Sequence, residues 1–101
     1  MDKKIVYFDM DGVLVNFQSG IDQLDLHDII EYKGRYDEVP GIFGTMKPNT
    51  EMISLFNVMF SDERYDCYVL STAPWENPSA SSDKVEWIQK YLPKAYKRLI
   101  L

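Results

Sequence analysis

Side chains that can do chemistry follow two apolar runs of the sequence at the point where each run ends. Asp9 and Asp11 come after the first run, and Ser71 and Thr72 come after the second. Two carboxylates this close can approach one metal ion and one reacting group, and Gly12 permits a tight turn beside them. A hydroxyl at a strand end can donate a hydrogen bond to a phosphoryl oxygen without adding charge. Each pair taken alone also occurs in ordinary solvated turns.

The two apolar runs are predicted to be strands of a parallel sheet. Residues 5–8 are continuously apolar and rich in β-formers, which suits a central strand buried on both faces. Residues 67–70 form the second run, and a third run begins at Arg98. Ligands of open parallel sheets bind beyond the carboxyl ends of the strands, where neighbouring loops converge. We therefore expect both sets of polar side chains to meet in one crevice.

Two helical patterns separate these runs. The first is expected to have Asn49 as its N-cap, and the second is expected to open at Asp83, with Glu86 completing a capping box, and to end before Pro93. The apolar positions expected to be buried are Met52, Leu55, Phe56, Met59 and Phe60 in the first helix, and Val85, Ile88 and Leu92 in the second. Alternation of strands and helices predicts an α/β fold, and the length suits one domain over residues 1–101.

Lys84 stands at the expected start of the second helix. The helix dipole disfavours a cation at that end, and a nearby phosphate dianion would account for the lysine. The alternative is a lysine that points to water beside Asp83.

Residues 17–46 interrupt the alternation with a polar segment that carries scattered aromatic side chains. We expect a small helical insertion that lies over the strand ends. Phe17 and Phe43 in this segment, together with Trp75 after the second strand, are candidates for an aromatic pocket. The alternative for the two phenylalanines is a small core that holds the insertion down. The single histidine, His27, is expected to lie on the surface and not to be a metal ligand.

Composition excludes several classes of protein. A formal net charge of −5 argues against binding a nucleic acid polymer, which needs clustered lysine and arginine. No run approaches the roughly 20 apolar residues that cross a bilayer, and the apolar stretch near the N-terminus is too short for a secretory signal. We expect a cytoplasmic protein without membrane contact. The lone Cys67 can form no internal disulfide and is expected in the core.

Several segments resemble a known family. Residues 9–14 (DMDGVL), placed directly after a strand, resemble the first motif of the haloacid dehalogenase superfamily. Residues 69–71 match its second motif and Lys84 its third. Three segments are similar to the cytosolic 5'(3')-deoxyribonucleotidases of that superfamily: residues 40–43 (PGIF), 70–78 (LSTAPWENP) and 83–87 (DKVEW). Together with the other motifs, this resemblance extends over nearly all of the chain.

The resemblance implies a magnesium-dependent phosphatase with a three-layer Rossmann-like core, a parallel sheet and a small helical cap. Asp9 is the implied nucleophile, which forms an aspartyl-phosphate, and Asp11 is the implied general acid and base. Asp9 and the backbone carbonyl of Asp11 are the implied ligands of Mg²⁺. The implied phosphate-binding residues are Ser71, Thr72 and Lys84.

The same resemblance implies a nucleoside monophosphate as substrate and inorganic phosphate as product. Phe17, Phe43 and Trp75 are the residues that would line the pocket for base and sugar. Two alternatives stay open: a sugar-phosphate phosphatase of the same superfamily, and a catalytically inactive remnant that binds phosphate, nucleotide or a partner.

The family also has an acidic pair after a further strand, and this chain reaches Leu101 without one. We therefore expect a core that lacks its C-terminal part, with weak magnesium binding and an open sheet edge that invites pairing with a second copy. Three explanations stay open: a truncated chain, a shortened relative without activity, and a protein completed by a partner.

Overall fold

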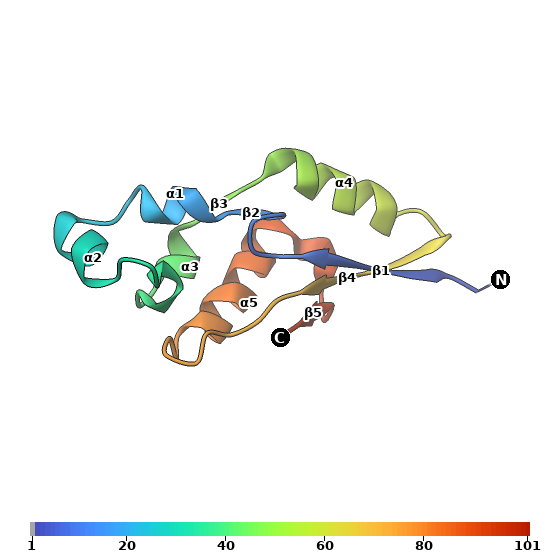
Figure 1. Ribbon diagram of the computed structural model, residues 1–101. Coiled ribbons are helices and arrows are strands. Elements are labelled where there is room, and N and C mark those ends of the chain that lie inside the picture. The colour runs from blue at the N-terminus through green and yellow to red at the C-terminus, as the bar shows by residue number, and fades with distance from the viewer. Residues whose placement is uncertain (1) are drawn as a thin grey trace.

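The computed structural model describes residues 2–101, which form a mixed arrangement of strands and helices (Figure 1). The strands are β1 (Lys4–Asp9), β2 (Val15–Asn16), β3 (Lys47–Pro48), β4 (Tyr65–Leu70) and β5 (Leu99–Ile100). The α-helices are α1 (Phe17–Ile21), α2 (Leu26–Glu31), α3 (Ile42–Thr45), α4 (Thr50–Phe60) and α5 (Ala80–Tyr91). Two short 3₁₀ helices are η1 (Tyr36–Glu38) and η2 (Pro93–Ala95).

The main sheet has the strand order β1-β4-β5, and all of its pairings are parallel. The connection from β1 to β4 contains β2, the insertion, β3 and then α4. The connection from β4 to β5 contains α5 and η2. The predicted α/β fold is confirmed. In the register, Asp9 lies opposite Leu70, and Leu70 lies opposite Ile100. The carboxyl ends of β1 and β4 therefore lie side by side, which is the arrangement that the two polar pairs require.

The sheet is covered on one face only by the described residues. Both crossovers run in the same direction across the sheet, and right-handed connections then place α4 and α5 on the same face. Phe8 and Val69 on that face are buried, whereas Ile5 and Tyr7 on the opposite face are 58% and 55% exposed. The expectation of a central first strand buried on both faces is wrong. The reason is that β1 is an edge strand here, and no described element packs on its second face.

Helix α4 packs against the sheet through Phe56, whose ring centroid lies 5.0 Å from that of Phe8 in an edge-to-face contact. Asn49 is the N-cap as predicted, and its side chain accepts a hydrogen bond from the amide of Met52. The expectation that Leu55 is buried is wrong, because it is 44% exposed. The sheet lies on one side of α4, so the helix face centred on Phe56 is buried. Leu55, one position away, lies at the margin of that buried face.

Helix α5 begins earlier than predicted. Its first residue is Ala80 with Ser79 as the N-cap position, so Asp83 lies inside the first turn and Lys84 follows it. The amide of Ala80 already donates a hydrogen bond to the carbonyl of Asn77, which starts the helical turn at the anchored loop before it. The predicted helix start at Asp83 is wrong, because tertiary contacts of the preceding loop start the helix at Ala80. The predicted end before Pro93 is confirmed.

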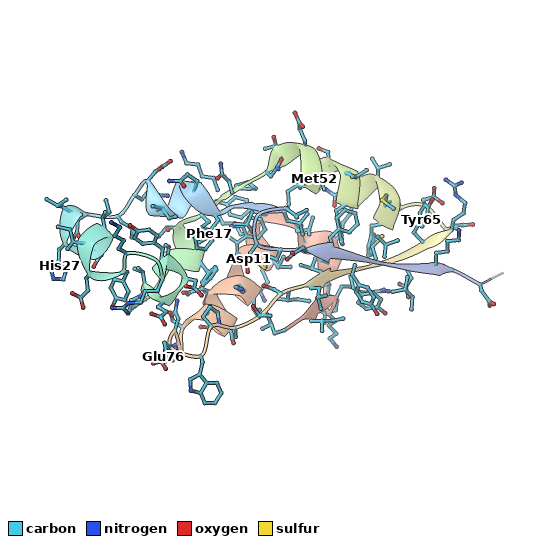
Figure 2. The ribbon with its side chains drawn as sticks, viewed as in Figure 1. Asp11, Phe17, His27, Met52, Tyr65 and Glu76 are labelled. Atoms are coloured by element: carbon cyan, nitrogen blue, oxygen red, sulfur yellow. The ribbon has the colours of Figure 1, made fainter. Side chains whose placement is uncertain are left out.

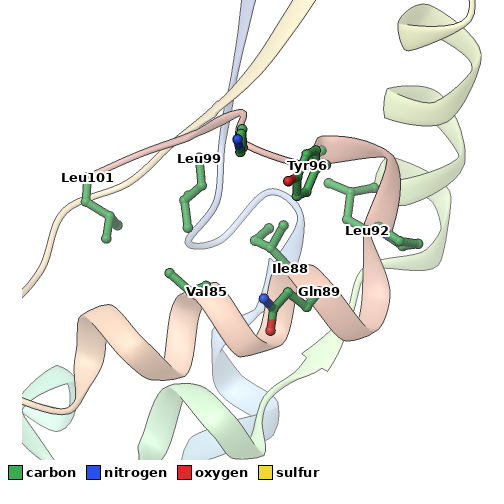
Figure 3. Close-up of a pocket in the computed structure, with 10 residues that line it drawn as sticks. Val85, Ile88, Gln89, Leu92, Tyr96, Leu99 and Leu101 are labelled. Carbon is green, nitrogen blue, oxygen red and sulfur yellow. The ribbon is translucent and has the colours of Figure 1, made fainter.

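An apolar groove of about 440 Å³ lies between α5 and the segment that follows it (Figure 3). Val85, expected in the core, lines this groove and is 42% exposed, which contradicts the prediction of its burial. Ile88 and Leu92 are buried as predicted. Val85 is left open because β5 is an edge strand, and no other strand within residues 2–101 covers this end of α5.

The insertion between β2 and β3 forms one end of an elongated molecule with extents of 53 × 25 × 21 Å (Figure 1). The short antiparallel pair β2 and β3 forms its base. A Cβ atom on Gly20 would lie 2.9 Å from Cγ of Met46, so glycine is needed for this close approach. Trp87 of α5 donates a hydrogen bond of 2.9 Å to the carbonyl of Met46, which ties the base to the core. None of the helices in residues 2–101 has the length and apolar character to cross a membrane.

Cys67 lies in β4 and is buried, as predicted, and burial raises the pKa of its thiol. The thiolate is the reactive form, so we expect Cys67 in the folded protein to react with a thiol reagent such as DTNB at least about 100-fold more slowly than a free thiol at pH 8. Full reactivity should appear in guanidinium chloride. Rapid, stoichiometric reaction of the folded protein would contradict this placement.

Candidate active site

The carboxylates of Asp9 and Asp11 lie at the end of β1, beside the end of β4. The amide of Met10 donates a hydrogen bond of 3.0 Å to the carbonyl of Leu70, which extends the pairing of the two strands by one step. The chain then turns sharply, with Gly12 at a φ of +76°, a conformation that favours glycine. A pocket of about 530 Å³ opens at this point, and its lining residues are Tyr7, Asp9, Asp11, Leu70, Ser71 and Thr72.

Lys84 reaches into this site from α5 and is completely buried. Its ammonium nitrogen lies 3.0 Å from Oδ2 of Asp11 and 2.7 Å from Oγ of Ser71, and it also donates to the carbonyl oxygen of Thr72. The Ser71 hydroxyl lies 3.3 Å from the same Asp11 oxygen, and the ring of Phe43 lies 4.2 Å from the ammonium. A buried ammonium needs such partners to be stable. The alternative of a lysine that points to water is therefore wrong.

The structure thus brings Asp9, Asp11, Ser71, Thr72 and Lys84 into one site. Residues from β1, β4 and α5 meet there, although up to 75 positions separate them in the sequence, counted from position 9 to position 84. Figure 2 shows Asp11 in the middle of the molecule, close to the start of the insertion. The site combines two carboxylates, a hydroxyl and a cation, a set that can hold a phosphoryl group and attack it.

Both aspartates of the site have carboxylate oxygens without a partner within the described residues. Within residues 2–101, no hydrogen bond or ion pair holds the exposed carboxylate of Asp9, and Oδ1 of Asp11 is buried without a hydrogen-bond partner. Magnesium binds oxygen ligands and keeps several waters. The exposed carboxylate of Asp9 could bind such a cation, together with the backbone carbonyl of Asp11.

The three aromatic candidates do not lie together. The rings of Phe17 and Phe43 have centroids 6.1 Å apart, and Phe43 belongs to the buried core with Phe17 packed against it. The two rings therefore pack with the main core and not in a separate small core of the insertion. Trp75 is 94% exposed in the loop between β4 and α5, so the structure does not bring it to the phenylalanine pair. A role of these residues in holding a substrate stays a prediction.

A second group of side chains that could hold a metal ion includes His27, which the sequence analysis did not expect to be a ligand. Asp25, His27 and Asp28 offer ligand atoms that all lie within 4.8 Å of one another. His27 is exposed as predicted, at the far end of the insertion from Asp11 (Figure 2). Asp25 already serves as the N-cap of α2 by accepting a hydrogen bond from the amide of Asp28. Helix capping accounts for the position of Asp25 in this group.

Asn77 is a residue that the sequence analysis missed. It is buried in the loop before α5, and its side chain donates hydrogen bonds to the carbonyls of Asp37 and Val39 in the insertion. The sequence shows only an asparagine between Glu76 and Pro78, which reads as an ordinary turn. Its long-range partners become visible only once the loop and the insertion are placed in space.

No protein-family model matches the chain. A protein of Vibrio phage KVP40, named "Putative 5'(3')-deoxyribonucleotidase", is 57% identical over 101 residues, which cover 99% of this chain. The chain spans 58% of the length of that relative. The name of this relative agrees with the nucleotidase-like motifs of the sequence.

Proposed function

We propose that the protein is a magnesium-dependent phosphatase that hydrolyses deoxynucleoside monophosphates. The observation that carries the proposal is a pocket lined by Asp9, Asp11 and Ser71. The buried Lys84 donates hydrogen bonds to two of these residues, Asp11 and Ser71. The name of the phage relative supports the class of substrate.

Asp9 is the proposed nucleophile because its carboxylate is exposed at the pocket and free of other partners. One of its oxygens forms a bond to phosphorus while the ester bond between phosphorus and the sugar oxygen breaks. Asp11 gives a proton to the departing sugar oxygen. It then takes a proton from water, which attacks phosphorus, breaks the bond to Asp9 and releases phosphate.

Ser71 and Lys84 hold the phosphoryl group in this proposal. The Ser71 hydroxyl can donate to a phosphoryl oxygen, and the buried ammonium of Lys84 offsets the negative charge that enters the pocket. Because Lys84 is shielded from water, its attraction for an anion is stronger than that of a surface lysine. Magnesium, held by Asp9 and Asp11, supplies further charge neutralisation when bound.

Release of inorganic phosphate from a substrate panel tests the proposal. We expect turnover of dUMP and dTMP with magnesium and much slower turnover of glucose 6-phosphate. Removal of the metal with EDTA should lower the rate by at least about 100-fold, because the carboxylates then repel the substrate dianion. Added magnesium should restore the rate. Absence of phosphate release from every substrate in the presence of magnesium would contradict the proposed function, and faster turnover of the sugar phosphate would contradict the proposed substrate class.

A further inference from the structure

Asn77 joins the insertion to the loop that leads from the candidate site to α5. It lies in the loop 71–79, which begins with the phosphate-binding candidates and ends at α5, the helix that carries Lys84. Its two side-chain hydrogen bonds, of 3.0 and 3.1 Å, end on the carbonyls of Asp37 and Val39. These carbonyls belong to the insertion, directly before the turn that leads to Phe43.

Every polar atom of the Asn77 side chain is used. The amide nitrogen makes the two bonds to the insertion, and the side-chain oxygen accepts a hydrogen bond of 2.9 Å from the hydroxyl of Ser79. The same Ser79 hydroxyl accepts a hydrogen bond of 3.2 Å from the amide of Gly41. Since Asn77 is buried, loss of any of these bonds would leave a polar atom without a partner.

The hydrogen bond from Gly41 to Ser79 connects Asn77 to a helix that contacts Lys84 of the candidate site. Gly41 is the N-cap of α3, and the next residues of that helix include Phe43, whose ring lies 4.2 Å from the ammonium of Lys84. The insertion is therefore fixed to the core by its base at β2 and β3 and again by Asn77. Asn77 therefore adds a polar attachment to the packing of Ile42, Phe43 and Met46 in the buried core.

We propose that Asn77 is a positioning residue that fixes the insertion against the β4–α5 loop, and so sets the space available to the part of the substrate beyond its phosphate. The inference rests on the proposed function for its kinetic consequence only. It predicts that breaking the Asn77 connection weakens the binding of a nucleotide more than that of a small phosphate ester.

Asn77→Asp and Asn77→Ala test the proposal. The aspartate has the same shape, but its oxygens would face two carbonyl oxygens, and the alanine removes all three hydrogen bonds. Ser81→Ala on α5 is the matched control, because its exposed side chain makes no hydrogen bond within the described residues. Ser79→Ala is a milder variant that removes only the hydroxyl between Asn77 and Gly41.

The first measurement is hydrogen exchange of the amides of residues 36–45. We expect exchange about tenfold faster or more in both Asn77 variants, an intermediate effect in Ser79→Ala, and no change in the control. Unchanged exchange in both Asn77 variants would overturn the proposal. Should the Asn77 variants fail to fold, unchanged exchange in a folded Ser79→Ala would overturn it as well. This readout does not depend on activity, so it stands even if the wild type hydrolyses no substrate and the proposed function fails.

The second measurement compares dUMP with p-nitrophenyl phosphate. We expect KM for dUMP to rise about tenfold in Asn77→Asp, and kcat/KM for the small ester to stay within about threefold of the wild type, because the residues that hold phosphate lie on the core. An equal loss for both substrates would show general damage to the site and would overturn the positioning role.

Discussion

Replacing Asp9 by asparagine should abolish phosphate release while leaving the fold intact. The carboxylate of Asp9 is exposed and makes no hydrogen bond or ion pair within the described residues, so the free energy of unfolding should change by less than about 0.5 kcal/mol. Asparagine has nearly the same shape but cannot form the bond to phosphorus. We expect kcat for dUMP to fall by at least about 10³-fold, as is usual when a covalent nucleophile is removed.

The matched control for this variant is Asp2→Asn, which removes the same charge from another exposed position. Thermal unfolding of both variants checks that the fold is kept, and single-turnover phosphate release checks the chemical step. Retention of more than about a tenth of the wild-type kcat in Asp9→Asn would rule out this residue as the nucleophile.

The position of the site could be predicted because it depends on local rules. Apolar runs predict strands, polar residues at their ends predict a crevice, and the observed pairing of Asp9 with Leu70 brings these ends together. The burial of Lys84 could not be predicted in the same way. Its sequence neighbours, Asp83 and Val85, give no sign that α5 turns this one charged side chain inward toward Asp11.

The wrong predictions of burial and of the start of α5 have a common physical cause. Burial of a strand or helix depends on which elements exist on its other side, and the pattern of residues 5–8 contains no information on whether a layer covers both faces. The start of α5 depends on Asn77, whose partners lie 38 and 40 positions away. Local propensities cannot register contacts at that distance, so tertiary packing decides these details.

Substitutions of Asp11 and of Lys84 should lower stability by unequal amounts, and both should abolish activity. Lys84 is completely buried, whereas the Asp11 side chain keeps 32% of its exposure to water. Asp11→Ala leaves a buried ammonium with only Ser71 and Thr72 as partners, and we expect it to lower the free energy of unfolding by about 3 kcal/mol. Lys84→Met removes the buried charge and fills nearly the same volume, so its cost should be less than about 1 kcal/mol.

Urea unfolding of the two variants and of the double variant separates this account from simple loss of contacts. Because methionine at position 84 needs no counter-charge, the double variant should be more stable than Asp11→Ala alone, and the coupling energy should reach about 2 kcal/mol. All three variants should lose phosphatase activity. Additive losses of stability in the double variant would contradict this account. They would show that the two side chains are not energetically coupled and that water reaches the Lys84 ammonium.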